Sequence, residues 1–164
     1  MWRKLAVYWR LNRKWKLLLL EALFELARAR FLKMLPFKTA AKTLGVRRAE
    51  SPSSCRDGEE QTLLEISKAV RWMARHTPWE SKCMETAIAA RYMLERRGIP
   101  CTLYFGAGRD PAGRFAAHAW LRSGPYVVTG AKEMRHFAPV EWFGTDPDRR
   151  GGRERIGRRR NGEG

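Results

Sequence analysis

The sequence predicts an α+β fold in which helices come first and a short antiparallel sheet follows. Apolar residues recur at helical spacing in three segments before residue 98. Three short segments with the composition of strands follow between residues 101 and 129, and turns that contain Gly separate them. Helices that precede a short meander of strands are typical of the α+β class.

The charge distribution predicts three regions. The 164 residues include 33 Lys+Arg and 17 Asp+Glu, a net charge of +16. Residues 1–48 hold 13 basic and 2 acidic side chains, residues 49–148 hold 13 of each, and residues 149–164 hold 7 and 2. A hydrophobic fraction of 44% excludes a wholly disordered chain. We expect a basic helical segment over 1–48, a folded core over 49–148 and a disordered Arg/Gly tail over 149–164.

The first helix is predicted from an apolar stripe at helical spacing, which consists of Leu17, Leu20, Phe24 and Phe31. It should end at Leu35, because Pro36 disfavours helical dihedral angles in the residue before it. Two alternatives stay open for this amphipathic helix: it packs on the core, or it is a docking or membrane-surface helix, since basic residues flank the stripe. The leucine run 17–20 covers more than one helix face, which favours burial against protein.

Two further helices follow a polar loop over residues 45–60. A helix over residues 60–75 is predicted from the spacing of Leu63, Ile66, Val70 and Met73. The next helix begins at Cys83 and ends near Gly98, a residue that readily takes the left-handed conformation of a helix C-terminus. Pro100 prevents the helix from resuming.

The strands are predicted over residues 101–105, 114–121 and 126–129. A turn rich in Gly and Asp joins the first two, and the tight turn 123–125 joins the last two.

Three cysteines at spacings of 28 and 18 residues fit neither a disulfide framework nor a paired zinc site, so we expect a reduced, cytoplasmic protein without a metal or organic cofactor. Cys83 is the informative one, because the unpaired N–H groups and the dipole of a helix start favour a thiolate. Cys55 lies in a loop with no histidine nearby in sequence. The leucine run 17–20 near the N-terminus is only four residues and is followed by Glu21, so it is too short for a signal peptide or a transmembrane helix.

His118 is the histidine that a regular element holds, because it lies within the second strand. His76 lies at a helix end and His136 in a late loop. A rigid imidazole opposite a thiol at a helix start is what a cysteine hydrolase or acyltransferase requires, since the histidine accepts the thiol proton and returns it to the leaving group. A structural role for either residue remains the alternative.

The run Lys82, Cys83, Met84, the helix end over residues 89–100 and the strand over residues 115–121 together resemble the transglutaminase-like leader peptidases of lasso peptide biosynthesis. The similarity is to the C-terminal, catalytic half of the fused microcin-processing enzyme, and it covers most of the chain. It implies a papain/transglutaminase-like fold and a cysteine protease that removes the leader from a ribosomally made precursor. It also implies that Cys83 is the nucleophile and His118 the general base.

The third member of the triad is the point at which the sequence departs from this family. The resemblance implies an aspartate about a dozen residues after the histidine, where this chain has Thr129 and Gly130; the nearest carboxylate is Glu133. A hydroxyl such as Thr129, a backbone carbonyl or Glu133 could orient His118. Trp79 and Trp120 flank the pair in sequence, and we expect them either to pack in the core or to shield the site and shape the peptide groove.

The resemblance implies three partners: a lasso precursor peptide, a leader-recognition protein and a macrolactam synthetase. The basic N-terminal segment is expected to dock an acidic or apolar partner surface. Three rival functions stay open: a nucleic-acid-binding module supported by the basic ends, a peptide transamidase that uses the same pair, and a membrane-peripheral protein with a degenerate active site. The charge-neutral middle and the absence of a nucleic-acid-binding motif favour a protein that binds no nucleic acid.

Overall fold

A computed structural model describes residues 12–110 and 112–145 of the chain. Its elements, in chain order, are α2 (Arg13–Met34), α3 (Phe37–Ala41), β1 (Val46–Arg47), α4 (Glu59–Ala74), α5 (Cys83–Arg96), β2 (Thr102–Arg109), β3 (Phe115–Ser123), β4 (Tyr126–Thr129), the 3-10 helix η1 (Met134–His136) and β5 (Phe137–Gly144). The predicted disordered tail lies outside the described residues.

All three predicted long helices are confirmed, with ends that follow local chemistry. The Asn12 side chain accepts a hydrogen bond from the backbone N–H of Lys14 (3.1 Å) and so caps the start of α2. Leu35, which precedes Pro36, has extended dihedral angles and ends α2 as expected. At the end of α5, Gly98 takes the left-handed conformation (φ 67°) that the sequence predicts there.

The sheet is antiparallel and has five strands in the order β1-β5-β2-β3-β4. β4 has the predicted bounds, whereas β2 and β3 extend beyond the predicted strands to Arg109 and Ser123. β1, β5 and α3 were not predicted from the sequence. β5 contains Pro139, which lacks the N–H that a central strand needs; the register of β2 against β5 shifts at this point, between Phe105 and Gly106.

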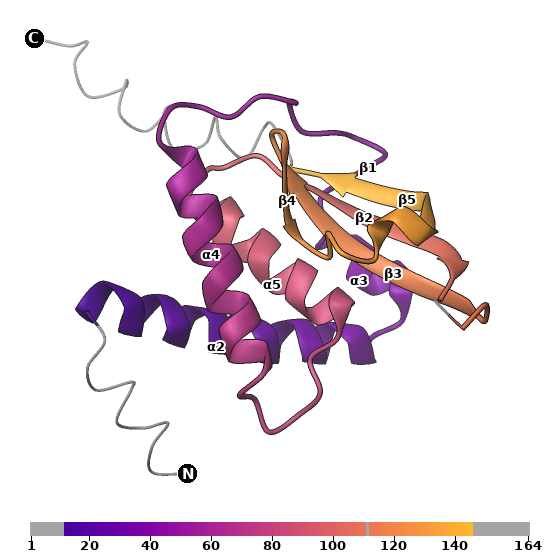
Figure 1. The fold of residues 1–164 in the computed structure, drawn as a ribbon, viewed down its shortest axis with the longest axis horizontal. Coiled ribbons are helices and arrows are strands. Elements are labelled where there is room, and N and C mark those ends of the chain that lie inside the picture. Colours follow the sequence, from indigo (N-terminus) through magenta and orange to yellow (C-terminus); the bar gives the residue numbers. More distant parts are fainter. Residues whose placement is uncertain (1–11, 111, 146–164) are drawn as a thin grey trace, which may run out of the picture.

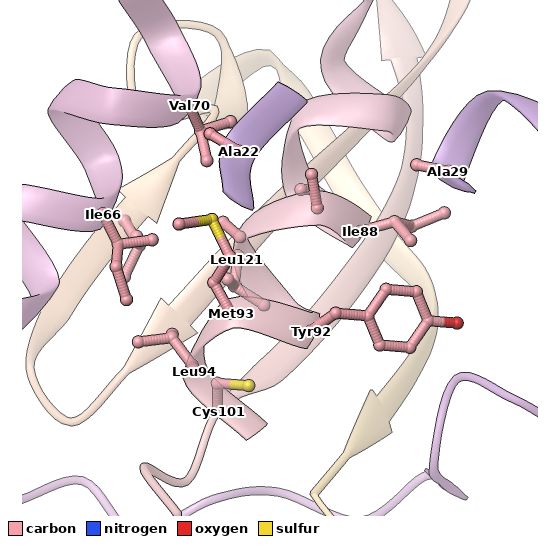
Figure 2. Packing of buried hydrophobic residues seen from close by; sticks show 14 of the residues in the cluster. Ala22, Ala29, Ile66, Val70, Ile88, Tyr92, Met93, Leu94, Cys101 and Leu121 are labelled. Atoms are coloured by element: carbon pink, nitrogen blue, oxygen red, sulfur yellow. The ribbon is translucent and has the colours of Figure 1, made fainter. Parts of the chain in front are cut away.

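The molecule is layered, with α2 on one side, α4 and α5 in the middle and the sheet on the other side (Figure 1). α4 and α5 each contact both α2 and the sheet, so they hold the centre of the core. Figure 2 shows this interior, where Ala22 of α2 and Val70 of α4 lie near Met93 of α5, with Leu121 of β3 behind them. These side chains are almost completely buried.

Ion pairs fasten α2 to the cysteine-bearing helix at both ends. Lys33 Nζ lies 3.0 Å from the buried Glu85 Oε1, in the first turn of α5. At the other end, the two guanidinium nitrogens of Arg97 donate to the two carboxylate oxygens of Glu21 at 2.8 and 2.7 Å. α2 therefore runs antiparallel to α5, and its C-terminal end lies beside the start of α5.

Candidate functional site

Cys83 is the first residue of α5, as the sequence predicts, and its side chain is half-buried. The helix turn that it opens is well ordered by hydrogen bonds: the Thr86 N–H donates to the Lys82 carbonyl (3.1 Å), and the Thr86 hydroxyl donates to the Cys83 carbonyl (2.9 Å). The first N–H groups of a helix have no partner within the helix. The sulfur therefore lies at a helix terminus whose partial positive charge stabilises negative charge.

The loop before Cys83 is held by the Thr77 hydroxyl, which lies 2.8 Å from the Trp79 carbonyl oxygen and 3.2 Å from the Ser81 hydroxyl. The indole Nε1 of Trp79 is buried and has no hydrogen-bond partner among the described residues. Trp79 thus brings an unpaired N–H donor to the segment that leads into α5, whichever of the two expected roles, core packing or shielding of the site, its ring has.

His118 lies on β3 with only 7% of its surface exposed, and a backbone carbonyl holds its ring. Its Nε2 lies 3.0 Å from the Gly130 carbonyl oxygen. Because a carbonyl oxygen can only accept, Nε2 carries the proton when the ring is neutral, and Nδ1 then has the free lone pair. This hydrogen bond selects the tautomer in which Nδ1 is the base.

The sequence leaves three candidates for orienting His118, and the structure distinguishes them. The Gly130 carbonyl makes the hydrogen bond described above. The Glu133 Oε2 lies 3.9 Å from the same Nε2, and its side chain is 57% exposed. The Thr129 hydroxyl is buried and makes no hydrogen bond among the described residues, so it does not orient the ring.

Aromatic rings surround the imidazole on its own sheet. The ring centroid of Trp120 lies 6.1 Å from that of His118, and Trp120 in turn stacks on Tyr104 at 5.4 Å. The ring centroid of Phe137, the first residue of β5, lies 5.1 Å from that of His118. Phe137 was not among the predicted site residues, because the strand that begins there was not predicted from the sequence.

Two glycines of β2 make room for this cluster. A β-carbon added at Gly106 would lie 2.6 Å from the Trp120 ring and 3.0 Å from the Phe137 β-carbon, and one added at Gly108 would lie 2.0 Å from the His136 carbonyl oxygen. Alternate glycines on one face of β2 are thus the sequence signal that the segment over 134–137 lies directly against the sheet.

The other two cysteines lie in surroundings that suppress thiolate formation. Burial raises the pKa of the Cys101 thiol to about 12. Burial and the charges of Glu59 and Glu60 also raise the pKa of Cys55. Both are therefore poor nucleophiles at neutral pH.

The two principal site residues come from elements in direct contact, because α5 packs on both β3 and β2. The structure brings His118 and Trp120 of β3 together with the Gly130 carbonyl and Glu133 of the connection after β4, and it places Cys83 at the start of the helix that packs on the sheet. Among the described residues, no hydrogen bond joins the Cys83 thiol to the His118 ring, so the structure places the two groups on adjoining elements without pairing them. A thiol beside an oriented imidazole is the arrangement that carries out nucleophilic attack on a carbonyl. Across residues 12–110 and 112–145, no group of three His, Cys, Asp or Glu residues is arranged to hold a metal ion.

Comparison with known families gives one finding. The model of the transglutaminase-like superfamily matches residues 22–141, a range that runs from the middle of α2 into β5 and includes Cys83, His118 and Glu133. The comparisons with curated proteins and with solved structures give no match.

Proposed function

The chain belongs to the transglutaminase-like superfamily, and we propose that within it the protein is a cysteine peptidase that removes the leader from a lasso precursor peptide. The superfamily includes cysteine peptidases and transglutaminases, and its α+β, papain-like architecture agrees with the fold described above. The observation that carries the proposal is the tautomer of His118, because the hydrogen bond to the Gly130 carbonyl leaves Nδ1 as a base.

In the proposed reaction, Nδ1 of His118 accepts the Cys83 thiol proton as the sulfur attacks the scissile carbonyl. The N–H groups at the start of α5 stabilise the oxyanion. The C–N bond breaks, the amine leaves with the proton from Nδ1, and an acyl thioester remains on Cys83. A water molecule then gives its proton to Nδ1 and attacks the thioester, which releases the leader acid and restores the thiol.

The Gly130 carbonyl contributes by binding the Nε2 proton throughout this cycle. When the ring is protonated, the same carbonyl receives a hydrogen bond from a charged donor, which is stronger than one from a neutral donor. Glu133 adds a negative charge 3.9 Å from Nε2, and its exposure weakens that contribution.

The proposed pathway has three other components: the precursor peptide, a leader-recognition protein that presents it, and a macrolactam synthetase that closes the ring. Cleavage itself consumes no ATP in this mechanism, so any nucleotide requirement is expected to come from the synthetase.

The proposal is tested by mass spectrometry of a candidate lasso precursor peptide, incubated with the protein with and without a leader-recognition protein. We expect a leader and a core peptide whose masses sum to that of the precursor plus one water. A product in which the acyl group is joined to an amine without added water would instead assign transamidation.

Substitutions identify the residues responsible. Cys83→Ala and His118→Ala are expected to abolish cleavage, because they remove the nucleophile and the base. Cys55→Ser is the matched control and should retain cleavage, as should Cys101→Ser where it folds. Cleavage by Cys83→Ala would contradict the proposal.

A further inference from the structure

The outer face of α2 carries large apolar side chains that the rest of the described chain leaves exposed. Their exposed fractions lie between 52% and 77%, and the residues are Leu17, Leu20, Phe24, Phe31 and Met34. These positions follow i, i+3, i+7, i+14 and i+17, so they form one stripe along the helix. We call this stripe the outer face of α2.

The outer face is additional to the face that builds the core. Leu18, Leu19, Ala22, Leu26 and Ala29 of the same helix are buried against α4 and α5. α2 is thus apolar on two sides, and only one of them is buried in the core. An apolar stripe of this length on a protein surface marks an interaction site.

The charges beside the outer face are positive. Arg13 and Arg30 are exposed, and Arg28 lies over the Tyr92 ring at 3.9 Å. The two carboxylates of α2 are already engaged by arginines: Glu21 pairs with Arg97, and the fully buried Glu25 pairs with Arg96 and Arg28. A partner of the outer face therefore meets apolar side chains bordered by cations.

This combination argues against a second copy of the chain, because two outer faces would bring arginines of like charge together. An anionic lipid surface offers acyl chains for the apolar side chains and negative headgroups for the guanidinium groups. The exposed apolar side chains also continue beyond α2 into Phe37, which is 57% exposed. In the sequence, residues 1–11 contain two Trp, one Tyr and three basic residues with no acidic residue, a composition that favours the membrane interface.

We propose that the outer face of α2 binds an anionic lipid surface. The helix lies in the plane of the interface, with Phe24 and Phe31 at the boundary of the acyl chains and Arg13 and Arg30 at the headgroups. Among the described residues no helix is long and apolar enough to cross a bilayer, so the attachment is peripheral. The proposal does not depend on peptide cleavage, and its test uses no peptide substrate.

The test measures co-sedimentation of the full chain with vesicles of phosphatidylcholine that contain about one third phosphatidylglycerol. We expect binding to these vesicles, weaker binding at high salt and little binding to phosphatidylcholine alone. Leu20→Asp should lower the partition coefficient about tenfold or more, because it places a charge in the apolar stripe. Leu64→Asp is the matched control: Leu64 lies on α4 and is 51% exposed, against 52% for Leu20, and this variant should bind like the wild type.

A second pair of variants tests the charges. Arg13→Gln with Arg30→Gln should lower binding to anionic vesicles about tenfold, whereas Arg75→Gln, at the exposed end of α4, should leave it unchanged. Thermal unfolding of each variant confirms that it is folded.

The lipid proposal is wrong if the wild type does not bind the anionic vesicles, or if Leu20→Asp and Leu64→Asp bind equally well. If the wild type binds no vesicles, binding of the leader-recognition protein to the wild type and to Leu20→Asp is compared. The informative result is that this protein binds the wild type and not the variant. That result would assign the outer face of α2 to a protein partner.

Discussion

At His118, a backbone carbonyl occupies the place where the resembled family has a carboxylate. The Gly130 oxygen fixes the ring by a 3.0 Å hydrogen bond, and the glycine itself takes a left-handed conformation (φ 78°). A side chain at this position would lie 2.7 Å from the Ala119 carbonyl oxygen and 3.0 Å from His118 Nε2. The orientation of the base therefore depends on the absence of a side chain here.

Gly130→Ala is expected to lower kcat at least tenfold, because the added methyl group displaces either the carbonyl or the imidazole. Gly113→Ala is the matched control, since Gly113 has the same φ of 78° but nothing within 4 Å of the added atom. The control carries the backbone strain alone, about 1 kcal/mol. Equal kcat for the two variants would show that the position does not affect His118.

Glu133→Gln is expected to lower kcat/KM only a few-fold, because an ion pair with an exposed partner contributes about 1 kcal/mol or less. The loss should disappear at high salt, which screens the charge in the wild type as well. Steady-state kinetics at two ionic strengths measures both effects. A loss of a hundredfold or more would instead make Glu133 the principal orienting group.

At the level of elements, the packing of α2 on α5 buries the carboxylate of Glu85, which lies two residues after Cys83. Glu85 is 1% exposed; its Oε1 pairs with Lys33, and its Oε2 has no hydrogen bond among the described residues. A buried carboxylate with a single partner depends strongly on that partner. The start of α5 is thus sensitive to changes in α2.

Lys33→Met is expected to destabilise the protein by about 2 kcal/mol, less than for a fully buried pair because Lys33 is 44% exposed. Urea unfolding measures the change. Lys38→Met, an exposed lysine of the neighbouring α3, should have little effect. The addition of Glu85→Gln to Lys33→Met should recover part of the loss, since it removes the unpaired charge.

The three long helices could be predicted from the sequence, and two of the five strands could not. Helical periodicity, Pro36 and Gly98 are local signals, and each gave a boundary that the structure confirms. β5 gives no such signal, because Pro139 interrupts it and three of its residues face solvent. Its place between β1 and β2 arises from pairing between segments far apart in the chain.

The site also combines residues that local sequence signals locate with contacts that depend on pairing between distant segments. Cys83 at the start of a helix and His118 on a strand could be located from local pattern alone, and the structure places both as expected. The sequence left the orienting group open, because a carbonyl is common to every residue and only the left-handed glycine marks this one. The position of Phe137 beside His118 depends on β5, so it could not be predicted before that strand was known.

At the scale of the whole molecule, several carboxylates are stabilised in their charged form by cations from other elements. Burial alone raises the pKa of Glu21, but the hydrogen bond and charge of Arg97, with the charge of Arg96, hold that pKa below its ordinary value. The hydrogen bond from Arg47 likewise lowers the pKa of Glu141. In the other direction, burial raises the pKa of Cys101 to about 12.

These shifts predict a stability that is greatest between mildly acidic and neutral pH. A carboxylate whose pKa is lowered in the folded state stabilises it above the unfolded value and loses that contribution as the pH falls through the folded value. A thiol whose pKa is raised stabilises the folded state below the unfolded value of 9.0 and loses that contribution as the pH rises toward about 12. Thermal unfolding as a function of pH should show both declines.

Variants separate the two declines. Glu21→Gln should make the acid decline shallower, and Cys101→Ala should make the alkaline decline shallower, each without affecting the other. A wild-type stability that stays constant above pH 9 would contradict the assignment to Cys101.

Gly108 of β2 lies directly against the chain segment that leads into β5. The His136 carbonyl oxygen occupies the space where a β-carbon would be, so even alanine at this position would push the chain around Phe137 away from the imidazole. Natural or engineered replacement of Gly108 should therefore be tolerated only together with a rebuilt connection between β4 and β5. A library that randomises this glycine alone is expected to return glycine when selected for turnover.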